Sequence, residues 1–202
     1  EPQEAGEIRL IAAERAPPED RPRLAQQAQD MRSTMNEDQG QLYDDVVAAL
    51  ETNTSLTVFV DAPGCAGKTF VGNALLAHVR SKGHIALPVA ISGVAALLYD
   101  GGRTAHSRFG IPIKITAYST CNITRRSEAG QLLREAKLIL WDEASMTHRY
   151  CPEALDRTLR DLMKVDQPFG GKVVIFLGES MSCTSYIIQL ATVPVGIKFL
   201  YP

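Results

Sequence analysis

The amino-acid sequence predicts an α/β fold in which a mostly parallel sheet is flanked by helices on both faces. Apolar stretches of strand length alternate with amphipathic segments at about the spacing of parallel β–α units. A glycine-rich loop joins the first of these stretches to a helical pattern. A later apolar run ends in two acidic residues, at the edge where open parallel sheets bind ligands.

Composition sets broad limits on the class of protein. The chain has 202 residues, of which 45% are hydrophobic and 22% charged, as is typical of one globular domain. Because the net charge is −2, any contact with nucleic acid has to come from a local patch. The four cysteines show no metal-binding spacing, and neither a secretory signal nor a membrane-spanning run is visible. We therefore expect an intracellular protein that does not associate with membranes.

The N-terminal part is expected to hold a tail and one helix. Residues 1–34 are rich in Glu, Pro, Arg and Gln with little periodicity, which predicts a tail or linker. Asn36 then supplies a helix cap, and acids follow it in the first turn. An apolar stripe at helical spacing continues to Leu50. By spacing alone, Gln39 is a solvated residue of the first turn.

Strands and helices are predicted to alternate along the rest of the chain. Runs of apolar and β-branched residues predict strands, and apolar residues three and four positions apart predict helices. Gly83 ends the first of these helices, and Gly101 stops the second. The predicted strands are 56–60, 85–90, 138–141 and 172–177, and the predicted helices are 68–80, 92–98, 128–136 and 153–163.

Two segments lack a clear pattern. Residues 103–108, Arg-Thr-Ala-His-Ser-Arg, are polar and basic, and by composition they could be only a solvated loop. Residues 110–127 contain Pro112 and show little periodicity, so we expect irregular structure there.

The glycine-rich loop has the spacing of a phosphate-binding loop. Its small residues would let backbone N–H groups surround phosphate oxygens at the positive end of the next helix. Lys68 would reach the β- and γ-phosphates, and the Thr69 hydroxyl would ligate Mg²⁺. The alternative is a strand–helix turn with an incidental lysine. The loop consists of Ala62, Pro63, Gly64, Cys65, Ala66, Gly67, Lys68 and Thr69.

Two positions differ from the usual form of this loop. Ala62 stands where Gly is usual, and Cys65 occupies a position that is commonly Gly. If position 65 needs a left-handed backbone, cysteine there costs on the order of 1 kcal/mol. We expect nucleotide binding to survive, with weakened affinity as the alternative.

The acidic pair is the second chemical landmark. Asp142 and Glu143 follow the apolar run Leu138–Trp141 and therefore come at the carboxyl end of a buried strand. Asp142 would hold Mg²⁺, directly or through a water molecule, and Glu143 would activate the attacking water as general base. A strand that ends in two solvated acids is the alternative.

Taken together, these motifs resemble those of Pif-type (petite-integration-frequency) DNA helicases of superfamily 1, most closely the helicase part of Helitron-like transposons. The resemblance covers about residues 35–178. It rests on the segments Met35–Gln39, Ala62–Thr69, Ile91–Ala96, Gly102–Ser107, Ser119–Ile123, Trp141–Met146, His148–Tyr150, Ala154–Arg160 and Pro168–Val174.

The resemblance implies a RecA-like ATP-binding domain, the first of two motor domains, which hydrolyses ATP with Mg²⁺ to unwind DNA. It implies that Gln39 contacts the adenine. It also implies that Thr104, His106 and Ser107 lie along a track for single-stranded DNA, where backbone contacts combine with base stacking. DNA repair, recombination, telomere maintenance and a nuclear location are expected on the same basis.

The resemblance stops after Gly178. The family continues Asp-Phe-x-Gln, whose Gln senses the γ-phosphate, whereas this chain continues Glu-Ser-Met-Ser. Our hypothesis is that residues 179–202 come from a frameshift, a retained intron or a decayed element, with the second motor domain missing. We then expect nucleotide binding, slow hydrolysis and no unwinding. The alternatives are a catalytically dead remnant that binds DNA or a partner, and a small-molecule phosphotransferase built on the same loop.

Overall fold

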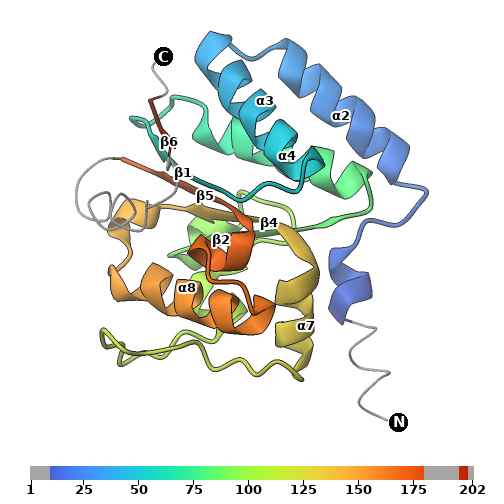
Figure 1. Cartoon of the computed structure of the whole chain (residues 1–202). Coiled ribbons are helices and arrows are strands. Elements are labelled where there is room, and N and C mark those ends of the chain that lie inside the picture. The colour runs from blue at the N-terminus through green and yellow to red at the C-terminus, as the bar shows by residue number, and fades with distance from the viewer. Residues whose placement is uncertain (1–9, 180–195, 200–202) are drawn as a thin grey trace.

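The computed structural model describes residues 10–179 and 196–199, and these form a parallel sheet with helices on both faces (Figure 1). The sheet has six strands in the order β3-β2-β4-β5-β1-β6, and every neighbouring pair is parallel. The predicted fold class is confirmed. The strands are β1 Leu56–Asp61, β2 Ile85–Ala90, β3 Arg103–Thr104, β4 Ala136–Asp142, β5 Val173–Gly178 and β6 Gly196–Phe199.

The helices divide between the two faces of this sheet. Figure 1 shows α2, α3 and α4 on one side and α7 and α8 on the other. The α-helices are α2 Arg21–Ser33, α3 Glu37–Glu51, α4 Lys68–Ser81, α5 Gly93–Ala96, α6 Ala105–Phe109, α7 Glu128–Glu135 and α8 Tyr150–Met163, and two 3₁₀ turns are η1 Ala144–Met146 and η2 Pro168–Gly171.

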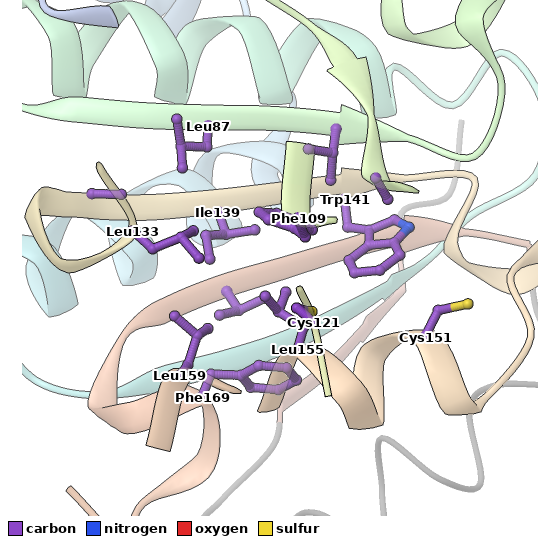
Figure 2. Close-up of a cluster of buried hydrophobic side chains, with 14 of the residues drawn as sticks. Leu87, Phe109, Cys121, Leu133, Ile139, Trp141, Cys151, Leu155, Leu159 and Phe169 are labelled. Atoms are coloured by element: carbon purple, nitrogen blue, oxygen red, sulfur yellow. The ribbon is translucent and has the colours of Figure 1, made fainter. Parts of the chain in front are cut away.

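Each face of the sheet carries its own core. Strand β4 shows why, because its successive side chains point to opposite faces. Ile139 and Trp141 pack among α7 and α8, and Figure 2 shows Trp141 beside Phe109. The centroid of the Trp141 ring lies 5.8 Å from that of Phe109 and 5.8 Å from that of Phe176. Leu138 and Leu140 pack on the other face, beneath α3 and α4. A strand buried on both faces reads as a continuous apolar run, which is how the sequence revealed it.

The strand register brings the carboxyl ends of β1 and β4 to the same edge of the sheet. Asp61 at the end of β1 is paired with Gly178 of β5, and Asp142 at the end of β4 is paired with Ala90 of β2. Because all the strands run the same way, the glycine-rich loop after β1 and the acids after β4 emerge on the same side of the sheet.

Part of the expected tail is helical. Residues Arg21–Ser33 form α2, which packs along α4, and residues 10–14 form a further helical turn. Among the residues of α2, only Ala28 is buried. The helix is therefore polar over most of its surface, and Leu24, Ala28 and Met31 form only a narrow apolar stripe. Contact with α4 supports the helix.

Two further segments differ from expectation or lie partly outside the described residues. The polar segment 103–108 is not a loop, because it forms the short strand β3 and begins α6. Within the segment 179–202, residues Gly196–Phe199 pair with β1 as β6, whereas 180–195 and 200–202 lie outside the described residues. In the described part of the chain, no helix is both long and apolar enough to cross a membrane.

Candidate nucleotide-binding site

A cleft of about 660 Å³ opens at the carboxyl edge of the sheet. The loop after β1 and the start of α4 form one wall, and the residues that follow β4 form another. Its lining is Gly64, Cys65, Ala66, Gly67, Lys68, Thr69, Phe70, Leu98, Asp142, Glu143, Ser145, Met146, Gly178 and Glu179. The structure thus brings the two predicted motifs together in one hollow.

The loop between β1 and α4 owes its shape to two left-handed residues. Cys65 has φ 65° and Gly67 has φ 81°, and Gly67 is also the residue that precedes the first turn of α4. Position 65 therefore has the left-handed backbone considered above, and a cysteine there costs on the order of 1 kcal/mol of folding free energy. Ala62 is buried, and its N–H donates to the Gly178 carbonyl at 3.1 Å, which ties the loop to β5.

Lys68 lies folded against the loop from which it extends. Its ammonium donates to the Pro63 carbonyl at 2.9 Å and also to the Ala62 carbonyl. Lys68 and Thr69 are the first two residues of α4, whose leading N–H groups have no partner within the helix. A cation, a hydroxyl and the positive end of a helix dipole thus line one cleft, an arrangement that favours an anion.

Gln39 reaches across this loop from α3. Its Nε2 donates to the Ala66 carbonyl at 3.1 Å, and its Oε1 accepts from the Asn36 N–H at 3.2 Å. A Cβ atom at Gly67 would lie 2.6 Å from Gln39 Nε2, so only glycine leaves room for this contact. Gln39 is therefore not merely a solvated first-turn residue, although contact with an adenine stays a prediction.

The two acids are held by partners from the segment between β2 and β3. Asp142 is buried, and its Oδ2 accepts from the Tyr99 hydroxyl at 2.8 Å while its Oδ1 accepts from the Glu143 N–H at 2.8 Å. Burial raises the pKa of Tyr99 well above its usual value, and the charge of Asp142 raises it further, so the phenol keeps its proton. The Glu143 carboxylate accepts from the Ser92 hydroxyl at 3.3 Å.

The donor set suits magnesium bound together with a nucleotide. Thr69 and Asp142 offer a hydroxyl and a carboxylate, which are hard oxygen ligands. Both side chains line the same cleft, and the Tyr99 hydroxyl holds the Asp142 carboxylate there. Among the described residues, no group of three or more His, Cys, Asp or Glu side chains could form a metal cage. Mg²⁺ typically takes one or two carboxylates and completes its shell with phosphate oxygens and water.

The residues predicted for a DNA track lie on the same edge but outside the cleft. Thr104 ends β3, which pairs with β2, and its hydroxyl caps α6 by accepting from the Ser107 N–H at 3.3 Å. His106 is half-buried and the Ser107 side chain is exposed. Arg108 is not available on this surface, because it is buried and ion-paired with Glu14.

Several residues of the site were not foreseen from the sequence, and three of them carry polar side chains beside the predicted groups. Ser92 and Tyr99 contact the acids, and Glu179 lines the cleft close to Gly64. Ser92 belongs to a motif that carried the resemblance, but no pattern linked it to Glu143. A glycine at position 72, in the second turn of α4, is the one local signal that could have drawn attention to Tyr99.

Comparison with known proteins points to the same family that the sequence motifs resemble. The sequence model of the PIF1-like helicase family matches residues 34–190, which extends past Gly178, where the motif similarity was expected to stop. The ATP-dependent DNA helicase Pif1 of Psychrobacter sp. (strain PRwf-1) is 30% identical over 128 residues, 62% of this chain and 19% of that protein. Uncharacterized protein 030L of Invertebrate iridescent virus 6 is 30% identical over 129 residues, 60% of this chain and 24% of that protein.

Solved structures agree on the fold. A Pif1 helicase from Bacteroides in complex with ADP-AlF3 and ssDNA is 26% identical, with a TM-score of 0.61 over 79% of this chain and 41% of that one. Pif1 helicase from Candida albicans, at 20% identity and a TM-score of 0.63 over 82% of this chain and 39% of that one, supports the fold alone. This chain therefore spans less than half the length of each of these relatives.

Proposed function

We propose that this chain, which belongs to the PIF1-like helicase family, forms the ATP-binding half of a DNA helicase motor that couples ATP hydrolysis to DNA unwinding. The observation that carries the proposal is the meeting of Lys68 and Thr69 with Asp142 and Glu143 in one cleft. Each pair alone is common, but a cation at a helix N-terminus facing two strand-end acids is the arrangement that phosphoryl transfer needs.

Each side chain has a defined task in this proposal. Lys68 binds the β- and γ-phosphates, and Gln39 contacts the adenine. Thr69 and Asp142 hold Mg²⁺, which supplies positive charge to the phosphate oxygens when it is bound with ATP. Glu143 takes a proton from the attacking water, and the hydroxyl of Ser92 orients its carboxylate.

Single-stranded DNA is the proposed second ligand. The support is the position of Thr104, His106 and Ser107 on the edge of the sheet that also holds the cleft, and the presence of ssDNA in two structures of Bacteroides Pif1. The chain alone should bind nucleotide, hydrolyse it slowly and unwind nothing. Unwinding needs a second domain, whose arginine typically contributes about 10³-fold or more to the rate. Roles in repair, recombination and telomere maintenance, a Helitron-like origin and a nuclear location stay predictions.

A fluorescent ATP analogue titrated into the chain with Mg²⁺ tests the nucleotide site. We expect saturable binding that Lys68→Ala weakens by about 10- to 100-fold, because a hydrogen bond to a charged group is lost. Lys82→Ala is the matched control, since Lys82 directly follows α4 at its opposite end and is exposed. Negligible binding by folded wild-type chain would overturn the proposal, as would equal binding by the wild type and Lys68→Ala.

A nucleotide-independent remnant that binds DNA or a partner is the second candidate. The left-handed backbone of Cys65, inside the loop that has to bind phosphate, is the observation that favours it. Affinity for an oligo(dT) probe distinguishes the two functions. The remnant should bind the probe equally with and without ATP, whereas the ATP-binding half of a motor should change its affinity.

A further inference from the structure

Tyr99 lies among the residues proposed to hold magnesium, although no motif includes it. It follows α5 in the segment between β2 and β3, and its ring is buried. The phenol donates to Asp142 Oδ2 at 2.8 Å. Its ring also lies next to Gly72 of α4 and Leu140 of β4, so Tyr99 packs against both elements that carry the proposed magnesium ligands.

The Tyr99 ring fits closely against α4 because residue 72 of that helix is a glycine. Gly72 is in the second turn of α4, where glycine is less favourable than alanine. A Cβ atom at position 72 would lie 3.0 Å from Tyr99 Cε1, 3.5 Å from the Tyr99 hydroxyl and 3.0 Å from Leu140 Cδ1. The bare backbone lets the ring pass against α4 and β4 and bring its hydroxyl to Asp142.

The carboxylate of Asp142 has two described hydrogen bonds, one on each oxygen. Oδ1 accepts from the Glu143 N–H and Oδ2 accepts from Tyr99. Each oxygen keeps a second lone pair for another partner. The Glu143 N–H is part of the same local turn and cannot alone fix the rotation of the carboxylate. The hydrogen bond from Tyr99 to the other oxygen fixes the plane of the Asp142 carboxylate.

We propose that Tyr99 is a positioning residue of the magnesium–nucleotide site, whose phenol holds the Asp142 carboxylate in the orientation that binds the metal. The inference rests on the proposed function, because it concerns the same cleft. Groups that orient a metal ligand typically contribute 10- to 100-fold to metal affinity. The proposed effect is therefore on the requirement for Mg²⁺, rather than on nucleotide affinity in general.

A Mg²⁺ titration at a fixed concentration of the fluorescent ATP analogue tests the inference by binding, without any measurement of turnover. Tyr99→Phe should raise the Mg²⁺ concentration at half-maximal binding by roughly tenfold, and it should leave binding in EDTA unchanged. Tyr43→Phe is the matched control, because Tyr43 is also a buried tyrosine but lies on α3 beside His78. It should titrate like the wild type.

Gly72→Ala provides an independent route to the same effect. The added methyl group should displace the Tyr99 ring, raise the Mg²⁺ midpoint in the wild-type background and add little to Tyr99→Phe, since both changes act on one hydrogen bond. If Tyr99→Phe does not fold, the single variant Gly72→Ala decides the question by the same titration.

The outcomes separate the inference from the proposed function. Failure of the wild type to bind nucleotide in a Mg²⁺-dependent way contradicts the proposed function. Mg²⁺-dependent wild-type binding with an unchanged midpoint in Tyr99→Phe overturns the role of Tyr99 alone. An equal shift in Tyr43→Phe also overturns it, because the effect would then follow from general loosening of the fold.

Discussion

Two residues that line the cleft hold a left-handed backbone although they carry side chains. Cys65 has φ 65° in the loop before α4, and Glu143 has φ 53° directly after β4. Each such residue costs on the order of 1 kcal/mol, and the surrounding structure has to offset that cost. At Glu143 the conformation turns the chain sharply, so that its N–H meets the Asp142 carboxylate and its own carboxylate meets Ser92.

Lys172 is a second residue whose environment is unusual. It is buried, and its amine donates to the carbonyl oxygens of Arg134 and Ala136 at 3.0 and 2.8 Å. The Arg134 carbonyl belongs to the last turn of α7 and has no partner in that helix. Lys172, which directly precedes β5, therefore caps the C-terminal end of α7. Its neutral amine can still donate both of these hydrogen bonds.

Stability should rise with pH through the titration of Lys172. Burial lowers its pKa from 10.5 to about 8, because the charged form is poorly solvated. Between pH 8 and 10.5 the folded protein has released this proton and the unfolded chain has not, so the group adds stability as pH rises, by on the order of 3 kcal/mol. Lys172→Met should abolish this rise in the free energy of unfolding, measured with urea at several pH values.

An exposed lysine provides the comparison for this pH effect. Lys164 follows α8, and its side chain is 61% exposed. Lys164→Met should keep the wild-type profile. A profile for Lys172→Met that runs parallel to the wild type between pH 8 and 10.5 would show that Lys172 does not titrate in this window.

At the scale of elements, the Gln39 side chain links the start of α3 to the glycine-rich loop. Asn36 caps the helix by accepting from the Gln39 N–H at 2.9 Å, and the Gln39 Oε1 in turn accepts from the Asn36 N–H. The Gln39 amide then donates to Ala66, 27 residues further along the chain. The capping box thus fixes the side chain that reaches over the loop.

Substitutions at the two ends of this capping box should have different effects on binding. Asn36→Ala and Gln39→Ala should each lower the free energy of unfolding by about 1 kcal/mol, through loss of the cap. Only Gln39→Ala should also weaken binding of the fluorescent ATP analogue, by up to about tenfold, because it removes the contact with the loop. Equal nucleotide affinity in the two variants would mean that Gln39 serves the helix alone.

At the scale of the whole molecule, the N-terminal segment that contains Glu14 is bound to α6, which follows the edge strand β3. Glu14 is ion-paired with Arg108 of α6, 94 residues away, with side chains only 9% and 2% exposed. Glu14 also attracts Arg80, a buried residue of α4 that is paired with Asp100. Two guanidinium groups therefore lie near one carboxylate in a poorly solvated place.

Removal of the Glu14 charge should destabilise the whole domain. Glu14→Gln should lower the free energy of unfolding by about 3 kcal/mol, because a buried charge loses its partner. The control is Glu19→Gln at an exposed glutamate of the same segment, which should change stability by less than about 0.5 kcal/mol. The double variant Glu14→Gln/Arg108→Gln should be less unstable than the sum of the two single changes. Additive losses in guanidinium unfolding would show that the pair is not coupled.

The sequence predicted most of the elements that position the site. The strand over 85–90 has the bounds expected from its apolar run, and α4 begins at Lys68 as the glycine-rich loop required. The helix α2 was missed, because its mostly polar surface leaves only a weak periodic signal. The strand β3 and helix α6 were missed because two and five residues are too short to show a period.

Local spacing alone predicted the chemical character of the cleft. A loop of small residues before Lys68 and two acids after an apolar strand are short-range patterns, and each works through neighbouring residues. Tertiary structure alone decided which partners hold these groups. Tyr99 meets Asp142 across 43 residues, and Gln39 meets Ala66 across 27. Such contacts depend on how helices and loops pack around the sheet, and the residues between the partners carry no sign of which side chains will meet.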